Sequence, residues 1–411
     1  MTDYRQVTES TEALVRLTRD QAHQLRNLSK LLASRRSWWG SESVETPKQG
    51  EVIRISQSDS DEYRITVRNV VGAISLGDLT LLVEPKIPMD HFVYIASRSL
   101  DLESREVDQG TTLGSGLFFH ELVARWLVTR SAQILRSGLS TDYEGMQDSL
   151  RYVRGRVDPT RTSINFLRGM PVIESEFEER TNNSPENRIL KSALNLVNLS
   201  GLDTEELRYS ASRLRKALSA VEDAEHNDLN LPPRSFPPRY RQAVDLAISV
   251  IRHSGRNLSG GNRAAGSFLI RTPNLIEDGI HKIIKQAVAP VPVSQGGRVL
   301  LPTSLRSNPD ILLSRPPKTA DVKYKFFGSM WNRADLAQGV FFAESYRSTT
   351  GAVIGFSHGP HRLPDVPVGR ITISPLFWDV AEGTTPQESA DRLIRSIETW
   401  LSSENSDLAL T

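Results

Sequence analysis

Two patterns of apolar and polar positions alternate along the chain. Short runs rich in β-branched residues, separated by polar or glycine-containing turns, predict strands, whereas apolar residues that recur every three or four positions predict helices. In the first half, strands are expected at residues 52–55, 63–67, 70–74 and 79–83, and helices at residues 9–36, 116–136 and 184–199. A strand-rich segment is therefore expected to follow a helical N-terminus.

In the second half the two patterns are mixed. Helical segments surround a loop at residues 227–238 that contains four prolines, and helices and strands then alternate to the end of the chain. Helices are expected at residues 275–287, 334–346 and 389–401, and strands at residues 311–313, 322–324 and 370–377. Elements in this order suit a mixed sheet flanked by helices.

We therefore predict an α+β protein with several domains. Its 411 residues suffice for two or three domains with ample cores. The predicted parts are an N-terminal helical segment and linker at residues 1–48, a β-rich domain at 49–155, a mainly helical middle region at 156–258 and a C-terminal α/β domain with a mixed central sheet at 259–411.

Composition and charge exclude several classes of protein. The net charge is +1, so no global field attracts nucleic acid, and any basic surface must be local. There is no cysteine, which excludes disulfides, thiol catalysis and cysteine-based zinc sites. No apolar run approaches the length of a membrane span, and the N-terminus lacks the apolar core of a signal peptide. We expect a cytoplasmic protein with no membrane contact.

The strongest candidate for chemistry is the segment at residues 308–325. Pro309 and Asp310 precede one predicted strand, and Asp321 and Lys323 lie on the next, after a proline-rich turn. If the strands pair, both aspartates can face one cleft, and Lys323 shares the face of Asp321 because side chains alternate with period two. Two carboxylates can hold Mg²⁺, which acidifies a water molecule, and a nearby lysine can orient or help deprotonate that water. The pattern predicts metal-assisted phosphodiester hydrolysis.

Fragments of this pattern also occur elsewhere and carry little information by themselves. Glu84 and Lys86 form a second acid-x-Lys triplet, and Pro364 and Asp365 form a second Pro-Asp pair. Only residues 308–325 combine both between apolar, strand-like flanks. On the pattern alone, a solvated hairpin with ordinary turn aspartates is an equal alternative.

The two flanking helices offer further site residues. Glu277 lies near the start of the helix at residues 275–287 and could project toward a metal, although a helix dipole favours an acid at this position in any case. Gln338, on the helix at residues 334–346, is either an active-site polar group or an exposed helical side chain. His281 is near this segment, but no second ligand at metal spacing accompanies it, so we assign it no function.

Arginines gather at residues 151–156, and an acidic run follows at residues 174–179. The arginines could contact a phosphate backbone or pair with the acidic run, and we favour the internal pairing. Asn187 and Arg188, at the start of the next predicted helix, are interpreted as a structural junction.

The spacing of the two aspartates and the lysine resembles the core of PD-(D/E)xK nucleases. The order of the site residues also resembles McrC, the endonuclease subunit of McrBC restriction systems. Segments at residues 72–86, 154–158 and 181–190 are similar to that family, and the similarity spans about residues 65–345. One position departs from the RecB-like branch of these nucleases, because Phe342 stands where that branch carries a tyrosine four residues after the glutamine.

This resemblance implies a C-terminal PD-(D/E)xK endonuclease domain that requires Mg²⁺ or Mn²⁺. The metal ligands would be Glu277, Asp310 and Asp321. Lys323 would position the attacking water, and Gln338 would support the site.

The resemblance also implies a partner and a substrate. Residues 49–155 would dock onto a McrB-type AAA+ GTPase in a hetero-oligomer and stimulate it, and the substrate would be foreign or modified double-stranded DNA. The chain has no Gly-Lys-Ser/Thr phosphate-binding loop, so we expect it to bind no nucleotide itself.

Two other functions stay open at this point. The chain could be a non-cleaving scaffold that activates a partner NTPase, and the phenylalanine at position 342 leaves room for that interpretation. It could also be a stand-alone RecB-like repair nuclease. The β-rich N-terminal half, which such an enzyme does not need, counts against the last alternative.

Overall fold

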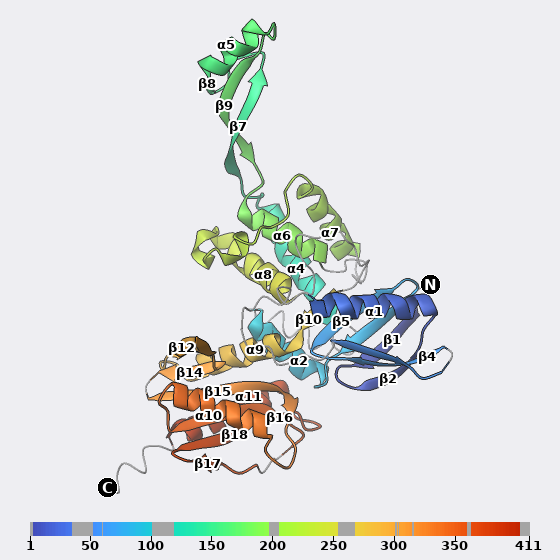
Figure 1. Cartoon of the computed structure of the whole chain (residues 1–411), viewed down its shortest axis with the longest axis vertical. Helices are drawn as coiled ribbons and strands as arrows, with labels where there is room; N and C mark the ends of the chain where they lie inside the picture. The colour runs from blue at the N-terminus through green and yellow to red at the C-terminus, as the bar shows by residue number, and fades with distance from the viewer. Residues whose placement is uncertain are drawn as a thin grey trace. The chain divides into compact units, whose positions relative to one another are not determined.

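The computed structural model divides the chain into two compact units (Figure 1). Unit 1 comprises Met1–Val123, Arg252–Asn257 and Gly261–Thr411, and unit 2 comprises Ala124–Ile251 and Leu258–Gly260. Unit 2 is therefore inserted into the sequence of unit 1. The residues that the structure describes are 3–34, 52–59, 61–100, 119–196, 205–253, 268–300, 302, 304–314, 316–359 and 363–402.

The described residues in the N-terminal part of unit 1 form two small sheets and two helices. One sheet has four strands in the order β1-β6-β5-β10, and the other has three in the order β2-β4-β3. Their alternating apolar side chains, with those of α1, form one buried core. The elements are β1 (Asp3–Thr8), β2 (Glu12–Arg16), α1 (Arg19–Ser34), β3 (Ile53–Gln57), β4 (Glu62–Val67), β5 (Val70–Leu76), β6 (Leu79–Glu84), α2 (Met89–Ser99) and β10 (Phe268–Arg271).

The C-terminal part of unit 1 is a six-stranded mixed sheet with flanking helices, as the sequence predicts. The strand order is β11-β14-β15-β16-β18-β17, and β15, β16 and β18 run parallel to one another. The elements are α9 (Thr272–Ala287), β11 (Val293–Ser294), β12 (Arg298–Leu300), β13 (Leu305–Ser307), β14 (Ile311–Ser314), β15 (Pro317–Phe326), α10 (Arg333–Ser345), β16 (Thr350–Ser357), β17 (Val366–Val368), β18 (Ile371–Asp379) and α11 (Pro386–Ser402).

The two parts of unit 1 are joined by backbone pairing and by close helix packing. Strand β10 pairs antiparallel with β5, so the C-terminal part starts as an edge of the N-terminal sheet. Helix α9 then packs on α2. A Cβ atom added to Gly279 would lie 2.4 Å from the carbonyl oxygen of Ile95, so this approach of the two helices requires glycine.

A buried polar cluster lies at the same junction. The Glu9 carboxylate is fully buried and accepts a hydrogen bond from the Thr272 hydroxyl at 2.5 Å. The Lys86 ammonium lies 4.0 Å from the centroid of the Tyr324 ring. Tyr324 belongs to the strand that carries Asp321. Burial raises the pKa of Glu9, although the nearby Lys86 opposes the shift. Lys86 therefore packs against β15 and is not a free surface lysine.

Unit 2 consists of helices and a long two-stranded arm (Figure 1). Strands β7 and β9 pair antiparallel, β8 adds to β9, and α5 packs on β9. None of the residues of α5 is buried, and Leu167 at its end is 88% exposed. The elements are α4 (Phe119–Arg136), β7 (Asp142–Leu150), β8 (Arg156–Val157), α5 (Pro159–Leu167), β9 (Ile173–Thr181), α6 (Pro185–Leu196), α7 (Glu205–Ala217), three 3₁₀ turns (Asp228–Asn230, Pro233–Ser235 and Pro238–Tyr240) and α8 (Arg241–His253).

The expected internal pairing of arginines with the acidic run is confirmed in the arm. The Arg154 guanidinium lies 3.5 Å from the Glu179 carboxylate and 3.9 Å from the centroid of the Phe177 ring. The register also places Arg156 opposite Glu176. These charges are partly neutralised within unit 2.

The structural junction expected at the start of α6 is also confirmed. The Asn187 amide is fully buried, donates to the carbonyl oxygens of Ser140 and Asn182, and accepts from the Tyr240 hydroxyl. Arg188 donates to both carboxylate oxygens of Asp228, at 2.9 and 2.7 Å. Both side chains therefore tie α6 to other segments of unit 2.

The structure corrects one prediction made from the sequence. Residues 9–36 are not helical throughout, because Glu12–Arg16 form strand β2 and pair with β4, while α1 confirms the helix after them. The described part of the middle region at 156–258 contains the helices α5, α6, α7 and α8 together with the strands β8 and β9. Residues 35–48 of the predicted linker lie outside the described residues.

Candidate active site

The two aspartates of the predicted site are brought together by the hairpin of β14 and β15. These strands pair antiparallel, with Ile311 opposite Ala320, so Asp310 comes directly before one strand and Asp321 lies within the other. The amide of Val322 donates to Asp310 Oδ2 at 2.7 Å. Asp321 is 4% exposed. The predicted hairpin is therefore confirmed, with a turn shorter than expected because Pro317 already belongs to β15.

Lys323 joins the aspartates to helix α10. It lies two residues after Asp321 on the same face of β15, and its Nζ is 2.5 Å from Asp321 Oδ2. The same ammonium donates to Gln338 Oε1 at 2.9 Å. Burial disfavours its charge, but the nearby Asp321 and Asp310 outweigh burial and raise the pKa of Lys323. At neutral pH this lysine is therefore a charged donor rather than a proton acceptor.

Glu277 completes the group from helix α9. Burial and the negative charge of Asp321 raise its pKa to about 7, although Lys323 and Arg271 oppose the shift. Burial, Glu277 and Asp321 likewise raise the pKa of Asp310 well above its usual value. The carboxylates therefore repel one another in a site with little solvent.

The donors present can be compared with those that a divalent cation needs. Among the described residues, no three His, Cys, Asp or Glu side chains are grouped closely enough to hold a metal ion, and the Lys323 ammonium lies against Asp321. The chemistry of the donors is nevertheless suitable, because Mg²⁺ prefers carboxylate oxygen. Burial, followed by repulsion between the carboxylates, raises the pKa values of Glu277 and Asp310, and a bound divalent cation would oppose both effects. The donors therefore fit Mg²⁺ in type.

The burial of Glu277 beside Asp321 predicts that the metal-free protein loses stability as the pH rises. The folded-state pKa of Glu277, about 7, is above the ordinary value of 4.5, so stability is full below pH 4.5 and falls until the pH passes 7. Glu277→Gln is expected to remove this loss and to raise the free energy of unfolding at pH 8 by about 3 kcal/mol. Urea denaturation at pH 4.5 and pH 8, without divalent cations, measures the difference.

The control is Glu398→Gln, which changes an exposed glutamate on α11 and should leave both values unchanged. Mg²⁺ should stabilise the wild type more than the Glu277→Gln variant at pH 8. Equal free energies of unfolding of wild type and variant at pH 8 would show that ionisation of Glu277 does not destabilise the folded protein.

Sequence reasoning missed two residues that hold the site in place. His281 Nδ1 lies 2.9 Å from the carbonyl oxygen of Asp310, one helical turn after Glu277 on α9. The Tyr346 hydroxyl donates to the Ser307 carbonyl and accepts from the Gly297 amide. The spacing of four residues from Glu277 was a signal for His281, because such residues share one face of a helix. No local signal marked Tyr346.

Gln338 and Phe342 differ in their surroundings. Gln338 faces the site and accepts from Lys323, as expected of a supporting residue. Phe342 is 5% exposed and is packed in the interior. The phenol that the RecB-like pattern expects at position 342 has no counterpart there, and Tyr346, one turn later, contacts the segment before Asp310 instead.

A known protein family matches this chain. The model of a family described as "McrBC 5-methylcytosine restriction system component" matches residues 65–354, which is more than half of the 411 residues. The chain belongs to the McrC family of McrBC restriction-system components. The resemblance inferred from its sequence is therefore confirmed at the level of the family.

A solved structure supports the fold of this McrC-family chain. A chain of the refined half-complex from a tetradecameric assembly of Thermococcus gammatolerans McrB AAA+ hexamers with bound McrC is similar, with a TM-score of 0.62 and 14% identity, over 97% of this chain and 100% of that chain. The structure of the Thermococcus gammatolerans McrBC complex also matches, with a TM-score of 0.46 and 15% identity, over 70% of this chain and 88% of that chain.

A search of curated proteins found no significant match. No helix among the described residues is both long enough and apolar enough to cross a membrane.

Proposed function

We propose that this chain is the Mg²⁺-dependent endonuclease subunit of a restriction complex and cleaves foreign or modified double-stranded DNA together with a McrB-type AAA+ GTPase. The observation that carries the proposal is the hairpin of β14 and β15. It holds Asp310 and Asp321 side by side. The Val322 amide donates a hydrogen bond to Asp310, and the charged Lys323 lies beside Asp321. This combination of two acids and a lysine suits phosphodiester hydrolysis, and a purely structural hairpin would not require it.

Each residue of the candidate site has a separate role in the proposed reaction. Glu277, Asp310 and Asp321 would hold Mg²⁺, which when bound acidifies water and stabilises negative charge on the phosphate. Lys323 keeps its proton, so it can orient the attacking water or donate to a phosphate oxygen. Gln338 fixes the position of that ammonium.

His281 acts through Asp310 rather than on the substrate. If Nδ1 carries the proton, it donates to the Asp310 carbonyl and fixes the backbone from which this carboxylate projects. His281 is therefore a positioning residue, and Tyr346 has a similar effect on the preceding segment.

The partner is inferred from the relative and from an exposed surface of unit 2. The similar structure contains McrC bound to McrB AAA+ hexamers. In this chain, apolar side chains stand exposed on and beside α5 of the arm, which is unusual unless a partner covers them. They are Ile164, Phe166, Leu167 and Met170. We infer that the arm contributes to docking, in addition to the contacts expected from residues 49–155.

The test is cleavage of methylated and unmethylated plasmids in Mg²⁺, with and without the partner NTPase and GTP. We expect cleavage that depends on the partner, on GTP and on the metal. A Leu167→Asp variant should lose the partner-dependent part because it places a charge on the exposed apolar surface of the arm. Strong cleavage without any partner would instead support a stand-alone repair nuclease, and no cleavage under any condition would end the proposal.

A second function rests on one observation. Phe342 stands where the RecB-like branch carries a tyrosine, and its side chain is 5% exposed and offers the site no hydroxyl. A scaffold that activates the partner NTPase without cutting DNA would not require that hydroxyl. That function would be established if the chain raised the NTPase rate of the partner while the plasmids stayed intact.

A further inference from the structure

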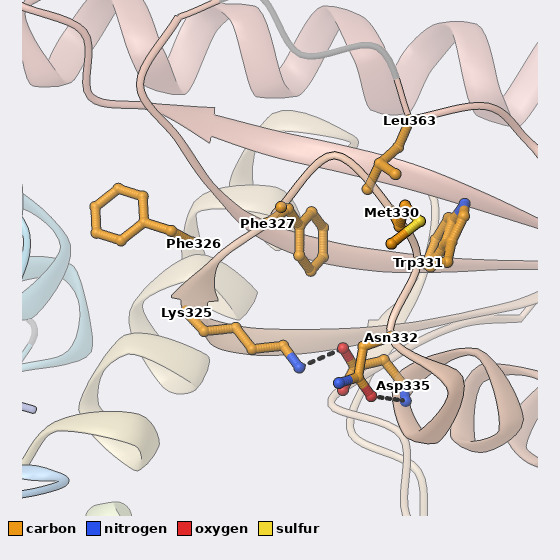
Figure 2. Close-up of a pocket in the computed structure, with 9 residues that line it drawn as sticks. Lys325, Phe326, Phe327, Met330, Trp331, Asn332, Asp335 and Leu363 are labelled. Carbon is orange, nitrogen blue, oxygen red and sulfur yellow. Dashed lines mark hydrogen bonds and ion pairs between the residues drawn. The ribbon is translucent and has the colours of Figure 1, made fainter.

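A cavity lies at the end of strand β15 (Figure 2), and the same strand carries Asp321 and Lys323 of the proposed active site. Its volume is about 310 Å³, at the lower end of the range of about 300–1,000 Å³ that small-molecule sites occupy. It can therefore take one ring system but not a large ligand. The lining residues are Lys325, Phe326, Phe327, Gly328, Met330, Trp331, Asn332, Asp335 and Leu363.

Two elements, β15 and α10, contribute residues to both the cavity and the proposed site. Lys325 lies two residues after Lys323, and both ammonium groups reach α10, where Lys325 pairs with Asp335 and Lys323 with Gln338. Asp335 and Gln338 are three residues apart and so lie on one face of that helix. Two residues of strand span about 7 Å, and successive nucleotides of one DNA strand are about 3.4 Å apart along the axis. The cavity is thus one or two nucleotides from the proposed point of cleavage.

One wall of the cavity is apolar and the opposite side is polar. Figure 2 shows Phe327, Met330, Trp331 and Leu363 gathered on one side, with Lys325 reaching Asp335 on the other. The Trp331 indole is fixed because its Nε1 donates to the Pro364 carbonyl at 2.8 Å. Aromatic faces of this kind stack on nucleobases of any sequence.

Met330 shows that the apolar wall is open to an incoming group. It is 81% exposed, although its neighbours Phe327 and Trp331 pack against the core of the C-terminal sheet. A flexible methionine at the mouth of a cavity is available to pack on the face of an incoming ring. On the polar side, the Lys325 ammonium is paired with the buried Asp335 carboxylate. The exposed Asn332 beside them offers an amide donor, which can match an acceptor on the edge of a base.

We propose that this cavity receives one unstacked nucleobase of the strand to be cut, stacked on the apolar wall with Met330 packed against it at the mouth. The inference rests on the proposed function, because it places the base beside the carboxylates that would cleave the strand. An unstacked base would bend the strand at this point and so present the neighbouring phosphate to the carboxylates.

Photocrosslinking tests the cavity without requiring cleavage. DNA substituted with 5-iodouracil would be irradiated with the full chain carrying Asp321→Asn, bound to the partner NTPase and a non-hydrolysable GTP analogue. We expect crosslinks on the peptide that contains Phe327, Met330 and Trp331, because iodouracil couples to aromatic and methionine side chains that stack on it. Crosslinks only elsewhere, or none above a control without iodouracil, would overturn the proposal.

A matched pair of variants adds a kinetic measurement in the active complex. Met330→Asp, at an exposed position, is expected to slow single-turnover cleavage about fivefold or more, since stacking of one base contributes at least about 1 kcal/mol. Val368→Asp introduces the same charge at an exposed apolar position on β17. This edge strand is separated from β15 by two other strands, so the variant should cleave like the wild type. Equal rates for both variants would overturn the proposal.

The two proposals can fail separately. Crosslinks in the cavity without cleavage by the wild type would refute the nuclease function and leave a nucleic-acid site. Cleavage by the wild type without crosslinks in the cavity would refute the base site alone.

Discussion

Asp321→Asn is expected to lower DNA cleavage by roughly a thousandfold or more, because metal-assisted hydrolysis supplies several kcal/mol of charge stabilisation and each 1.4 kcal/mol is about tenfold in rate. The substitution keeps the size of the side chain, but it removes the charge that would hold the metal and that lies 2.5 Å from Lys323. Single-turnover cleavage of plasmid by the assembled complex measures the loss.

The second Pro-Asp pair supplies a matched control for this variant. Asp365 follows Pro364 as Asp310 follows Pro309, but it is exposed and no acid-x-Lys triplet comes after it. Asp365→Asn should therefore cleave DNA like the wild type. Asp321→Asn should still raise the NTPase rate of the partner, since docking does not depend on this carboxylate. Wild-type rates of cleavage by Asp321→Asn would show that the site has been assigned to the wrong residues.

Arg188→Ala is expected to destabilise unit 2 by about 3–5 kcal/mol, because it leaves the buried Asp228 carboxylate without its partner. Asp228 is 4% exposed, and two hydrogen bonds from the guanidinium hold it. A third guanidinium bond goes to the Asn183 carbonyl, which would also lose its donor. Hydrogen exchange of the amides in α6 measures the effect on unit 2 itself, which global unfolding of a two-unit chain would average.

Two further variants distinguish a lost ion pair from a general effect of removing an arginine. Arg208→Ala changes an exposed arginine on α7 of the same unit and should alter stability by less than about 0.5 kcal/mol. Replacing Arg188 with methionine and Asp228 with leucine together should recover part of the loss, since no charge is then buried alone. Protection of α6 that is unchanged in Arg188→Ala would contradict this account.

The elements that carry the candidate site were predictable because their signals are local. The alternation of residues around Asp321 predicted β15, the spacing of apolar residues predicted α9 and α10, and the hairpin followed from a short proline-containing turn. Placing Lys323 on the same face as Asp321 needed only the period of a strand. The functions of these residues stay predictions until activity is measured.

What could not be predicted depends on pairing between distant segments. The spacing of Leu14 and Leu17 fits a helix, but residues 12–16 instead pair with β4, more than forty residues later, and tertiary pairing overrides such weak local preferences. The contact of Tyr346 with Ser307 likewise joins segments whose proximity no local pattern encodes. The same limit hid the contact between Lys86 and Tyr324.

The insertion of unit 2 into unit 1 has a consequence for the protein as it leaves the ribosome. Strand β5 is made early, but its neighbour β10 and all five predicted site residues are translated only after the whole of unit 2. Until then β5 presents an unpaired edge, and no carboxylate of the site exists. A nascent or prematurely terminated chain that stops before residue 321 therefore cannot assemble the carboxylate group, even when all of unit 2 has been made.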